Sequence, residues 1–454
     1  MYKFIKFVIT TLIIAAAVNA ASCKKYLEEK PDKKLVIPAT LADLQALLDN
    51  NNIIVRADCY SDEVSADNYY LPETIWQNLA ENDKRLHTWQ KDFVFAPAFN
   101  DWSRLYTKIY YANTVLETIE KIEQTSTNKS AWDNIKGQAL LVRAKALMQA
   151  VMIWCPAYDA ISSATDMGLP IRVTTDFTKR EQRATLQRTY DQITGDFALA
   201  IGLLPPTASH PARGSRVAAY SFLSRTFLAM RKYAEAKNYA DSALQINREL
   251  LDYNSLSTTS NFPFPTFNKE MNYYTTAFIT LLEFGYARVD SSLYKSYASD
   301  DCRKLVFFRI NADGTPSFKG HYTGSNGGLF TGVSTNELYI TRAECLARMG
   351  SLADAITDLN TLLIKRFKTG TFVPFSSSNA AGLLDKILTE RRKELLFRGL
   401  RWMDLKRLNK EGNGIVLQRK LNNQTYTLQP NDKGYALPIP EDVISISGIQ
   451  QNPR

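Results

Sequence analysis

The same helical pattern occurs twice in this chain, and this repetition limits how the chain can fold more than any other feature. Residues 218–244 and 337–363 place apolar or small side chains at matching positions, including Ala236 and Ala355. In each copy the apolar positions recur at intervals of three and four on both sides of a short break, which is typical of a helix, a turn and a second helix. One helix pair cannot bury its apolar face alone, so further helices must pack against both copies.

The spacing resembles that of the tetratricopeptide repeat, in which small residues let two antiparallel helices approach closely. Arg342 departs from this pattern, because the repeat usually has an apolar residue there. Residues 103–122 and 132–154 also carry apolar side chains at intervals of three and four. We therefore expect a mainly α-helical fold in which helix pairs form the scaffold.

Several stretches lack the helical period and read as loops. Between residues 252 and 335, Ser, Thr, Asn, Pro, Gly and Tyr dominate, and residues 160–180 and 371–382 are similar. Within the first stretch, two strand-like runs meet at Asp313-Gly314, a favoured hairpin turn. We expect long loops with a few short β-hairpins on a rigid helical frame, which is where binding sites are commonly found.

The beginning of the chain has the order of a secretory signal peptide. MYKFIK carries two lysines, and residues 7–18 are apolar. A bilayer needs about 20 apolar residues, so this segment is too short to span one. Ala20-Ala21-Ser22-Cys23 resembles a bacterial lipobox, which predicts removal of residues 1–22 and lipid attachment at Cys23. The alternative is an ordinary signal peptide cut near Ala21, with Cys23 incidental.

Composition excludes several classes of protein. The formal net charge is +9, but lysines and arginines are interspersed with acids rather than grouped in a basic stripe, so we expect no nucleic-acid partner. The cysteines after Cys23 are too sparse for a disulfide scaffold and lack metal-ligand spacing. Cys345 lies in an apolar helical pattern and is expected to be buried, and a bond between Cys59 and Cys302 is left open.

No motif for catalysis, a metal or a cofactor is present. The three histidines, His87, His210 and His321, stand outside any zinc-binding pattern, and the chain has no nucleophile elbow or phosphate-binding loop. Acid pairs such as Asp58 with Asp62, or Asp300 with Asp301, resemble those of a glycosidase only if a cleft brings them together. We therefore expect no enzyme, with an unrecognised hydrolase as an alternative.

The most distinctive polar stretch is residues 389–408. Here acids and bases alternate at helical spacing, so that Glu394 can pair with Arg398 along one side. We interpret the stretch as a salt-bridged packing helix rather than a catalytic cluster. Trp102 and Trp402 lie in helical patterns and are assigned to the core.

The same stretch resembles the signature of SusD/RagB-type lipoproteins, ER-x-E-L-x-F-x-G-x-R-W-x-DL-x-R. Four further segments agree with that family in order along the chain. These are SCKKYLEEKP near the start, WSRLYTKIYYAN at 102–113, RAECLARMGSLADAITDLNTLLIKR at 342–366 and the closing YALPIPEDVISISGIQQNP. Arg398 replaces a common glutamate of the signature.

The resemblance implies a lipid-anchored protein on the surface of a bacterial outer membrane, with a SusD-like fold and tetratricopeptide-like helix pairs. It implies no catalysis and no cofactor. The implied partner is a SusC-like TonB-dependent transporter, to which the protein delivers an oligosaccharide or, in some members, a peptide. We divide the chain into residues 1–22, 23–215 and 216–454, with the last two packed as one globular unit.

Sugar rings are bound by flat aromatic side chains with amides, carboxylates or arginine at their edges. Two loop-like clusters have this composition, and we predict that they bind ligand: Asp67, Asn68, Tyr69, Tyr70 and Trp76 in the first, and Asn272, Tyr273 and Tyr274 in the second. The alternative for each of these side chains is that it packs a loop onto the frame.

The sequence thus predicts a nutrient-binding lipoprotein that captures an oligosaccharide for import. Two alternatives stay open: a peptide-binding subunit of the same family, and a helical-repeat lipoprotein that serves only as a scaffold for other envelope proteins.

Overall fold

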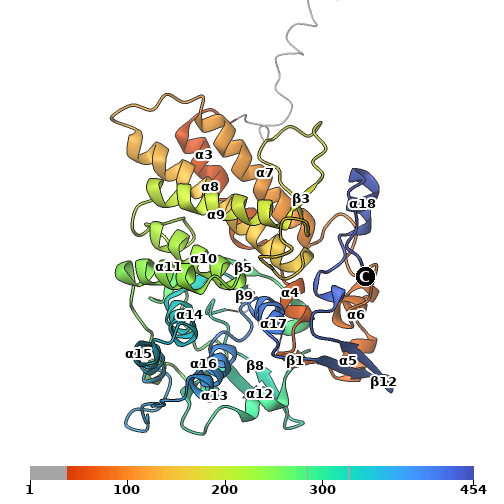
Figure 1. Ribbon diagram of the computed structural model, residues 1–454, viewed down its shortest axis with the longest axis vertical. Coiled ribbons are helices and arrows are strands. Elements are labelled where there is room, and N and C mark those ends of the chain that lie inside the picture. The colour runs from red at the N-terminus through yellow and green to blue at the C-terminus, as the bar shows by residue number, and fades with distance from the viewer. Residues whose placement is uncertain (1–37, 284, 326–327) are drawn as a thin grey trace, which may run out of the picture. The chain divides into compact units, whose positions relative to one another are not determined.

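The computed structural model describes residues 38–283, 285–325 and 328–454. Residues 41–454 form one compact unit, and this unit is mainly α-helical with short strands, as predicted (Figure 1). The predicted signal peptide and Cys23 lie outside the described residues, and the predicted division after residue 215 stays a prediction. None of the helices in the described part of the chain is long and apolar enough to cross a membrane.

Long helices pack side by side in one continuous row. Each member contacts the next, and α14 contacts both α15 and α16. Figure 1 shows α7 and α8 at one end of the row and α15 and α16 at the other. The members are α7 (Asp101–Ile119), α8 (Lys129–Trp154), α9 (Leu186–Leu203), α10 (Arg216–Ala229), α11 (Tyr233–Ile246), α14 (Thr335–Arg348), α15 (Leu352–Leu363) and α16 (Ala380–Glu394).

Both predicted repeats are confirmed as helix, turn and helix, formed by α10 with α11 and by α14 with α15. Ala236 and Ala355 are fully buried between the paired helices. The close approach that a small residue permits is visible at Ala236, whose carbonyl accepts a 2.8 Å hydrogen bond from the Ser224 hydroxyl on the facing helix. The two repeats join the row because α11 packs on α14.

Polar side chains fix where the long helices begin and end. At the start of α7, Asn100 and Ser103 form a reciprocal capping box, in which each side chain bonds the other residue's backbone. At the end of α8, the buried ammonium of Lys406 donates to the carbonyls of Met152 and Cys155. A cation at this position also interacts favourably with the negative end of the helix dipole.

The strands form two-stranded antiparallel pairs. The hairpin predicted at Asp313-Gly314 is confirmed, and Gly314 has a φ of +78°, a conformation that glycine adopts without strain. The pairs are β1 (Tyr69–Tyr70) with β6 (Arg288–Val289), β2 (Met167–Pro170) with β3 (Arg183–Thr185), β4 (Met271–Tyr273) with β10 (Val333–Ser334), β5 (Thr276–Ala277) with β9 (Leu329–Phe330), β7 (Phe308–Ile310) with β8 (Pro316–Phe318), and β11 (Leu417–Leu421) with β12 (Gln424–Leu428).

Short helices complete the fold, and the sequence did not indicate several of them. Two helices, α12 and α13, fall inside the loop-like stretch 252–335, while α16 begins within the loop expected at 371–382 and β2 lies within 160–180. The short helices are α3 (Leu41–Leu48), α4 (Ser61–Ser65), α5 (Glu73–Gln77), α6 (Glu81–His87), α12 (Ser291–Lys295), α13 (Cys302–Phe307), α17 (Arg401–Lys410) and α18 (Glu441–Ser447), with single turns at Asn51–Val55, Tyr253–Ser255, Thr280–Leu282 and Lys433–Tyr435.

The prediction of a single helix over residues 389–408 is wrong. The chain turns sharply between the end of α16 at Glu394 and the start of α17 at Arg401. Gly399 has a φ of +68° and cannot continue the helix. Its amide donates a 2.8 Å hydrogen bond to Glu63, far away in the sequence. Glu394 consequently does not pair with Arg398, and instead accepts hydrogen bonds from Arg303 and Arg366.

Core assignments from the sequence agree with the structure. Trp102 is 5 % exposed and Trp402 is fully buried. Cys345 is buried, as predicted, and the bond left open between Cys59 and Cys302 is not formed, because the cysteines within the described residues are all free thiols.

Candidate functional site

The first predicted cluster borders a polar cavity of about 420 Å³, which we call the β1 pocket. Strand β1 forms one wall, and strand β11 forms another. Asp67, Tyr69 and Tyr70 from the predicted cluster line the pocket. Leu71, which follows β1, also lines the pocket, and the remaining lining residues come from other segments: His87, Trp89, Asp290, Ser292, Arg392 and residues 416–421.

The two tyrosines of β1 have different surroundings because successive side chains on a strand point to opposite faces. Tyr69 is 4 % exposed, and its hydroxyl donates a 2.8 Å hydrogen bond to the Val64 carbonyl. Tyr70 is 37 % exposed, and no hydrogen bond engages its hydroxyl within the described residues. Tyr70 is therefore the most exposed aromatic ring among the residues that line this pocket.

Asp67 and Asn68 are held by arginines of α16 and α17. Arg401 forms a two-pronged ion pair with Asp67 at 2.7 and 2.9 Å. Burial alone would raise the pKa of Asp67, but the charges of Arg401 and Arg392 outweigh it and lower the pKa below its ordinary value. Arg392 also donates to the Asn68 side chain at 3.3 Å. Asp67 thus stays ionised and fixes the loop that precedes β1.

Strand β11 contributes polar groups that were not predicted from the sequence. Along Leu417–Leu421, buried and exposed residues alternate, so Gln418 and Lys420 point away from the core. Neither side chain has a hydrogen-bond partner among the residues that the structure describes, and across the pocket Asp290 lies 3.6 Å from Arg392. The pocket that Tyr70 lines therefore also offers an amide, a cation and a carboxylate. The alternation of Leu417 to Leu421 was the signal available in the sequence.

Glu63, which accepts a hydrogen bond from the Asn68 side chain, makes the stability of the protein depend on pH. Burial raises the pKa of its carboxyl to about 7, although hydrogen bonds from Asn68 and Gly399 lower it. The folded state holds the proton of the Glu63 carboxyl more tightly than the unfolded chain does. Protonation of Glu63 therefore stabilises the fold fully below the ordinary pKa of 4.5, and this stabilisation is lost as the pH rises through about 7.

Glu63→Gln is accordingly expected to gain free energy of unfolding over the wild type as the pH rises, by roughly 3 kcal/mol between pH 4.5 and pH 8. The difference should shrink towards pH 4.5. Urea denaturation at several pH values measures it, with the exposed Glu81→Gln as the control. A difference that does not change with pH would contradict the assignment.

The other predicted ligand residues do not line the β1 pocket. Trp76, on α5, is half-buried and has the Lys84 ammonium 5.8 Å from its ring centre. In the second cluster, Asn272 accepts a 2.8 Å hydrogen bond from Asn247, and Tyr273 is 1 % exposed against Phe222. The neighbouring Tyr274 packs against aromatic rings. In this structure these side chains make packing contacts, and a ligand role for them stays a prediction.

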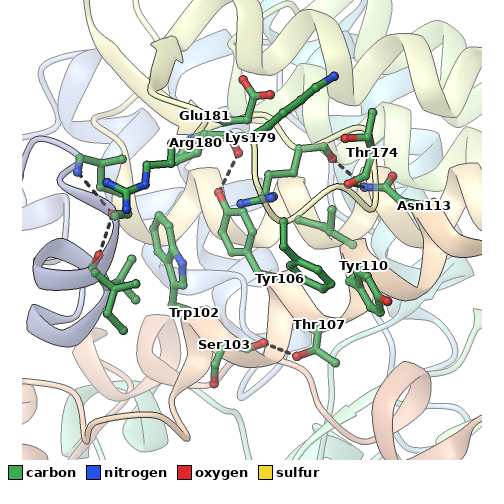
Figure 2. Close-up of a pocket in the computed structure, with 18 of the residues that line it drawn as sticks. Trp102, Ser103, Tyr106, Thr107, Tyr110, Asn113, Thr174, Lys179, Arg180 and Glu181 are labelled. Atoms are coloured by element: carbon green, nitrogen blue, oxygen red, sulfur yellow. Dashed lines mark hydrogen bonds between the residues drawn. The ribbon is translucent and has the colours of Figure 1, made fainter. Parts of the chain in front are cut away.

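A second cavity, of about 640 Å³, lies along one face of α7, and we call it the α7 pocket (Figure 2). Trp102, Tyr106 and Tyr110 are spaced one helical turn apart and therefore share this face. Trp102 stacks on Tyr106 with ring centres 4.7 Å apart, and Tyr110 stacks on Phe177 at 5.0 Å. Trp102 was predicted to lie in the core, and the cavity was not predicted because the covering loop follows α7 by some 50 residues.

The loop over the α7 pocket, residues 171–181, is held by hydrogen bonds from α7 and its neighbourhood. Asn113 donates to the carbonyls of Arg172 and Thr174, and Tyr106 donates to the carbonyl of Pro170 at 2.9 Å. Helix α18 closes the opposite side with aliphatic side chains. The walls of the cavity are therefore formed by three segments, namely α7, the loop 171–181 and α18.

One member of each acid pair considered for hydrolysis is engaged by buried cations. Asp58 is buried between Lys108 and Lys145, and Asp301 forms an ion pair with Arg303 at 2.8 Å. These carboxylates neutralise buried cations. No group of three or more metal-ligating side chains is arranged to hold an ion within the described ranges.

Comparison with family models decides the family. A model described as starch-binding and associating with the outer membrane matches residues 25–228, and the SusD family model matches residues 335–454. Together they cover well over half of the sequence. The chain belongs to the SusD/RagB family. No curated protein matches the sequence.

Solved structures agree with this SusD-like fold. A SusD superfamily protein from Bacteroides thetaiotaomicron shares 22 % identity with a TM-score of 0.72, over 91 % of this chain and all of the other. A SusD superfamily protein from Bacteroides vulgatus has 18 % identity and a TM-score of 0.74, over 92 % and 99 % of the two chains. A SusD-like carbohydrate-binding protein from the same species has 19 % identity and a TM-score of 0.66, over 90 % and 97 %.

Proposed function

We propose that this SusD-family protein binds an oligosaccharide in the β1 pocket and delivers it to a SusC-like transporter. The observation that carries the proposal is that the partly exposed ring of Tyr70 lines the same pocket as Gln418 and Lys420, whose side chains have no hydrogen-bond partner among the described residues. A sugar ring presents an apolar face of CH groups and a rim of hydroxyls. Such a ligand stacks on an aromatic side chain while its hydroxyls satisfy the polar groups at the edge.

Carboxylate and guanidinium groups side by side suit this chemistry. Asp290 accepts and Arg392 donates, so neighbouring hydroxyls of one sugar can each find a partner. Both groups are fixed in advance, since Asp290 caps α12 through the Leu293 amide and Arg392 donates to the Asp67 carbonyl. Fixed partners reduce the entropy that is lost on binding.

The location and the partner rest on the family and on the sequence. Members of the family associate with the outer membrane, as the matching model describes. We propose that lipid attached to Cys23 anchors the mature chain at the cell surface, with a TonB-dependent transporter as its partner. On this account the protein is a binding subunit without catalysis or a cofactor.

A peptide ligand would need different hydrogen-bonding groups in the site. An extended peptide offers backbone amides and carbonyls, which pair best with an open strand edge or a row of backbone groups. The β1 pocket instead offers polar side chains together with one exposed ring, which favours a sugar.

Calorimetric titration of the mature protein with neutral oligosaccharides and with peptides of matched size tests the proposal. We expect saturable heat with at least one oligosaccharide and none with the peptides. Binding of peptides alone would establish the peptide-binding alternative, and binding of neither would favour the scaffold protein.

A further inference from the structure

The α7 pocket has a different chemistry from the β1 pocket, and it points to a different ligand. Its walls carry the aromatic stripe of α7, the ring of Phe177 and aliphatic side chains that include Ile109, Val443 and Ile446. A sugar placed here would turn many of its hydroxyls toward carbon, which costs free energy for every unpaired group. An apolar ligand has no hydrogen bonds to lose in the same place, and burial of its apolar surface contributes favourable binding free energy.

Most polar groups at the walls are already occupied. The Tyr106 hydroxyl and the Asn113 amide are used to hold the covering loop, and Thr175 is bonded to Glu117. These residues position the walls and leave few partners for a ligand with many polar groups. The exposed fraction of Phe177, 74 %, shows that much of its ring remains open.

Cations remain at the mouth of the pocket without acidic partners. Within the described residues, Arg172 donates to the backbone carbonyl of Asp176 at 2.9 Å but forms no ion pair. Arg180 likewise has no carboxylate partner, and it extends across the mouth toward α18, whereas Lys179 and Glu181 point away (Figure 2). Glu181 is the one acid among the residues that line the pocket, and Asp176 interacts with the charge of Arg172 without forming an ion pair with it. The two guanidinium groups can therefore still pair with an anion.

We propose that the α7 pocket is a second binding site, for an amphipathic anion with a flat aromatic body and one acidic group. The rings of Trp102, Tyr110 and Phe177 would bury the body, while Arg172 and Arg180 would pair with the acid at the mouth. A volume of about 640 Å³ lies within the range of small-molecule sites and accommodates a body of several rings. This site is separate from the sugar site and does not depend on the proposed function.

A pair of fluorescent probes tests the proposal on the mature protein. 8-Anilinonaphthalene-1-sulfonate carries three aromatic rings and one sulfonate, and N-phenyl-1-naphthylamine has the same rings without the charge. We expect the sulfonate to bind one molecule per chain and more tightly than the amine. Its affinity should fall as salt is added, because the ion pair at the mouth is screened.

Substitutions locate the probe. Phe177→Ala is expected to weaken sulfonate binding about tenfold through the loss of stacking and burial. Arg180→Gln is expected to weaken it about two- to fivefold, the effect of one partly exposed ion pair, and to leave binding of the uncharged amine unchanged. Phe278→Ala and Lys91→Gln, exposed residues outside both pockets, are the matched controls and should bind the sulfonate like the wild type.

Three results would overturn the proposal: equal affinity for the two probes, sulfonate binding that survives Phe177→Ala, or displacement of the sulfonate by a saturating oligosaccharide. The last result would place the sugar in the α7 pocket. Failure of oligosaccharides to bind at all would contradict the proposed function but would leave the probe result standing, so the two failures are distinguishable.

Discussion

Glu394→Ala is expected to lower the free energy of unfolding by about 3–5 kcal/mol, the usual cost of breaking a buried ion pair by removing one partner. Glu394 is fully buried at the end of α16. Its carboxylate accepts hydrogen bonds from Arg303 at 3.1 Å, Arg366 at 2.9 Å and Asn336 at 2.7 Å. Its removal leaves two buried guanidinium groups with fewer counter-charges.

The network around Glu394 explains why this effect should be large. Arg366 also contacts Glu270 at 2.7 Å, and Arg303 also contacts Asp301 and Glu390. The network therefore joins α13 and α16 to the segments that carry Glu270 and Arg366. Burial alone would raise the pKa of Glu394, but the two arginines outweigh it and lower the pKa below its ordinary value.

Urea denaturation followed by far-ultraviolet circular dichroism measures the loss. The control is Lys129→Ala, which removes an exposed ion pair with Asp133 one turn away on α8 and should cost less than about 1 kcal/mol. If both variants unfold at the same urea concentration as the wild type, the buried ion pairs of Glu394 do not stabilise the fold. Glu394→Gln, which keeps the shape of the side chain, should lie between the alanine variant and the wild type.

Tyr70→Ala is expected to weaken oligosaccharide binding by about ten- to one-hundredfold. The ring supplies the stacking surface of the β1 pocket, and loss of one stacking contact together with its burial amounts to about 1.5–3 kcal/mol. The fold should tolerate the change, because Tyr70 is 37 % exposed and its hydroxyl makes no hydrogen bond within the described residues. Calorimetric titration with the oligosaccharide bound best by the wild type gives the affinity.

Tyr286→Ala is the matched control, since Tyr286 has the same exposed fraction and does not line the pocket. It should bind the oligosaccharide with wild-type affinity. Equal losses in the two variants would mean that the effect of Tyr70 is not specific to the pocket. Wild-type affinity in Tyr70→Ala would show that the oligosaccharide does not stack on Tyr70 in the β1 pocket.

The helical frame could be predicted because its signal is local. Residues three and four apart carry the pattern of α10, α11, α14 and α15, and the small residues at 236 and 355 mark where paired helices touch. The break between α16 and α17 could not be predicted in the same way. It depends on Gly399 donating to Glu63, a contact between residues far apart in the sequence.

The candidate site was predictable only in part for the same reason. Tyr70 belongs to an aromatic and polar cluster that the sequence displays in one stretch, whereas Gln418 and Lys420 reach the pocket through tertiary packing. Composition also could not separate Tyr69 from Tyr70. Pairing of β1 with β6 decides which of the two points into the core.

The α7 pocket illustrates a further limit. A stripe of Trp102, Tyr106 and Tyr110 at helical spacing is the usual pattern of a core-facing helix, and Trp102 is indeed buried. The cavity arises because loop 171–181 and α18 meet this stripe from distant parts of the chain. Nothing in the periodicity of α7 distinguishes a stripe that packs completely from one that leaves space.

The most direct test of the central claim is a crystal structure of the mature protein with the oligosaccharide that it binds best. The account predicts a sugar ring stacked on Tyr70, with hydroxyls within hydrogen-bond distance of Asp290 and Arg392. An oligosaccharide bound elsewhere on the protein, with the β1 pocket holding only water, would contradict it.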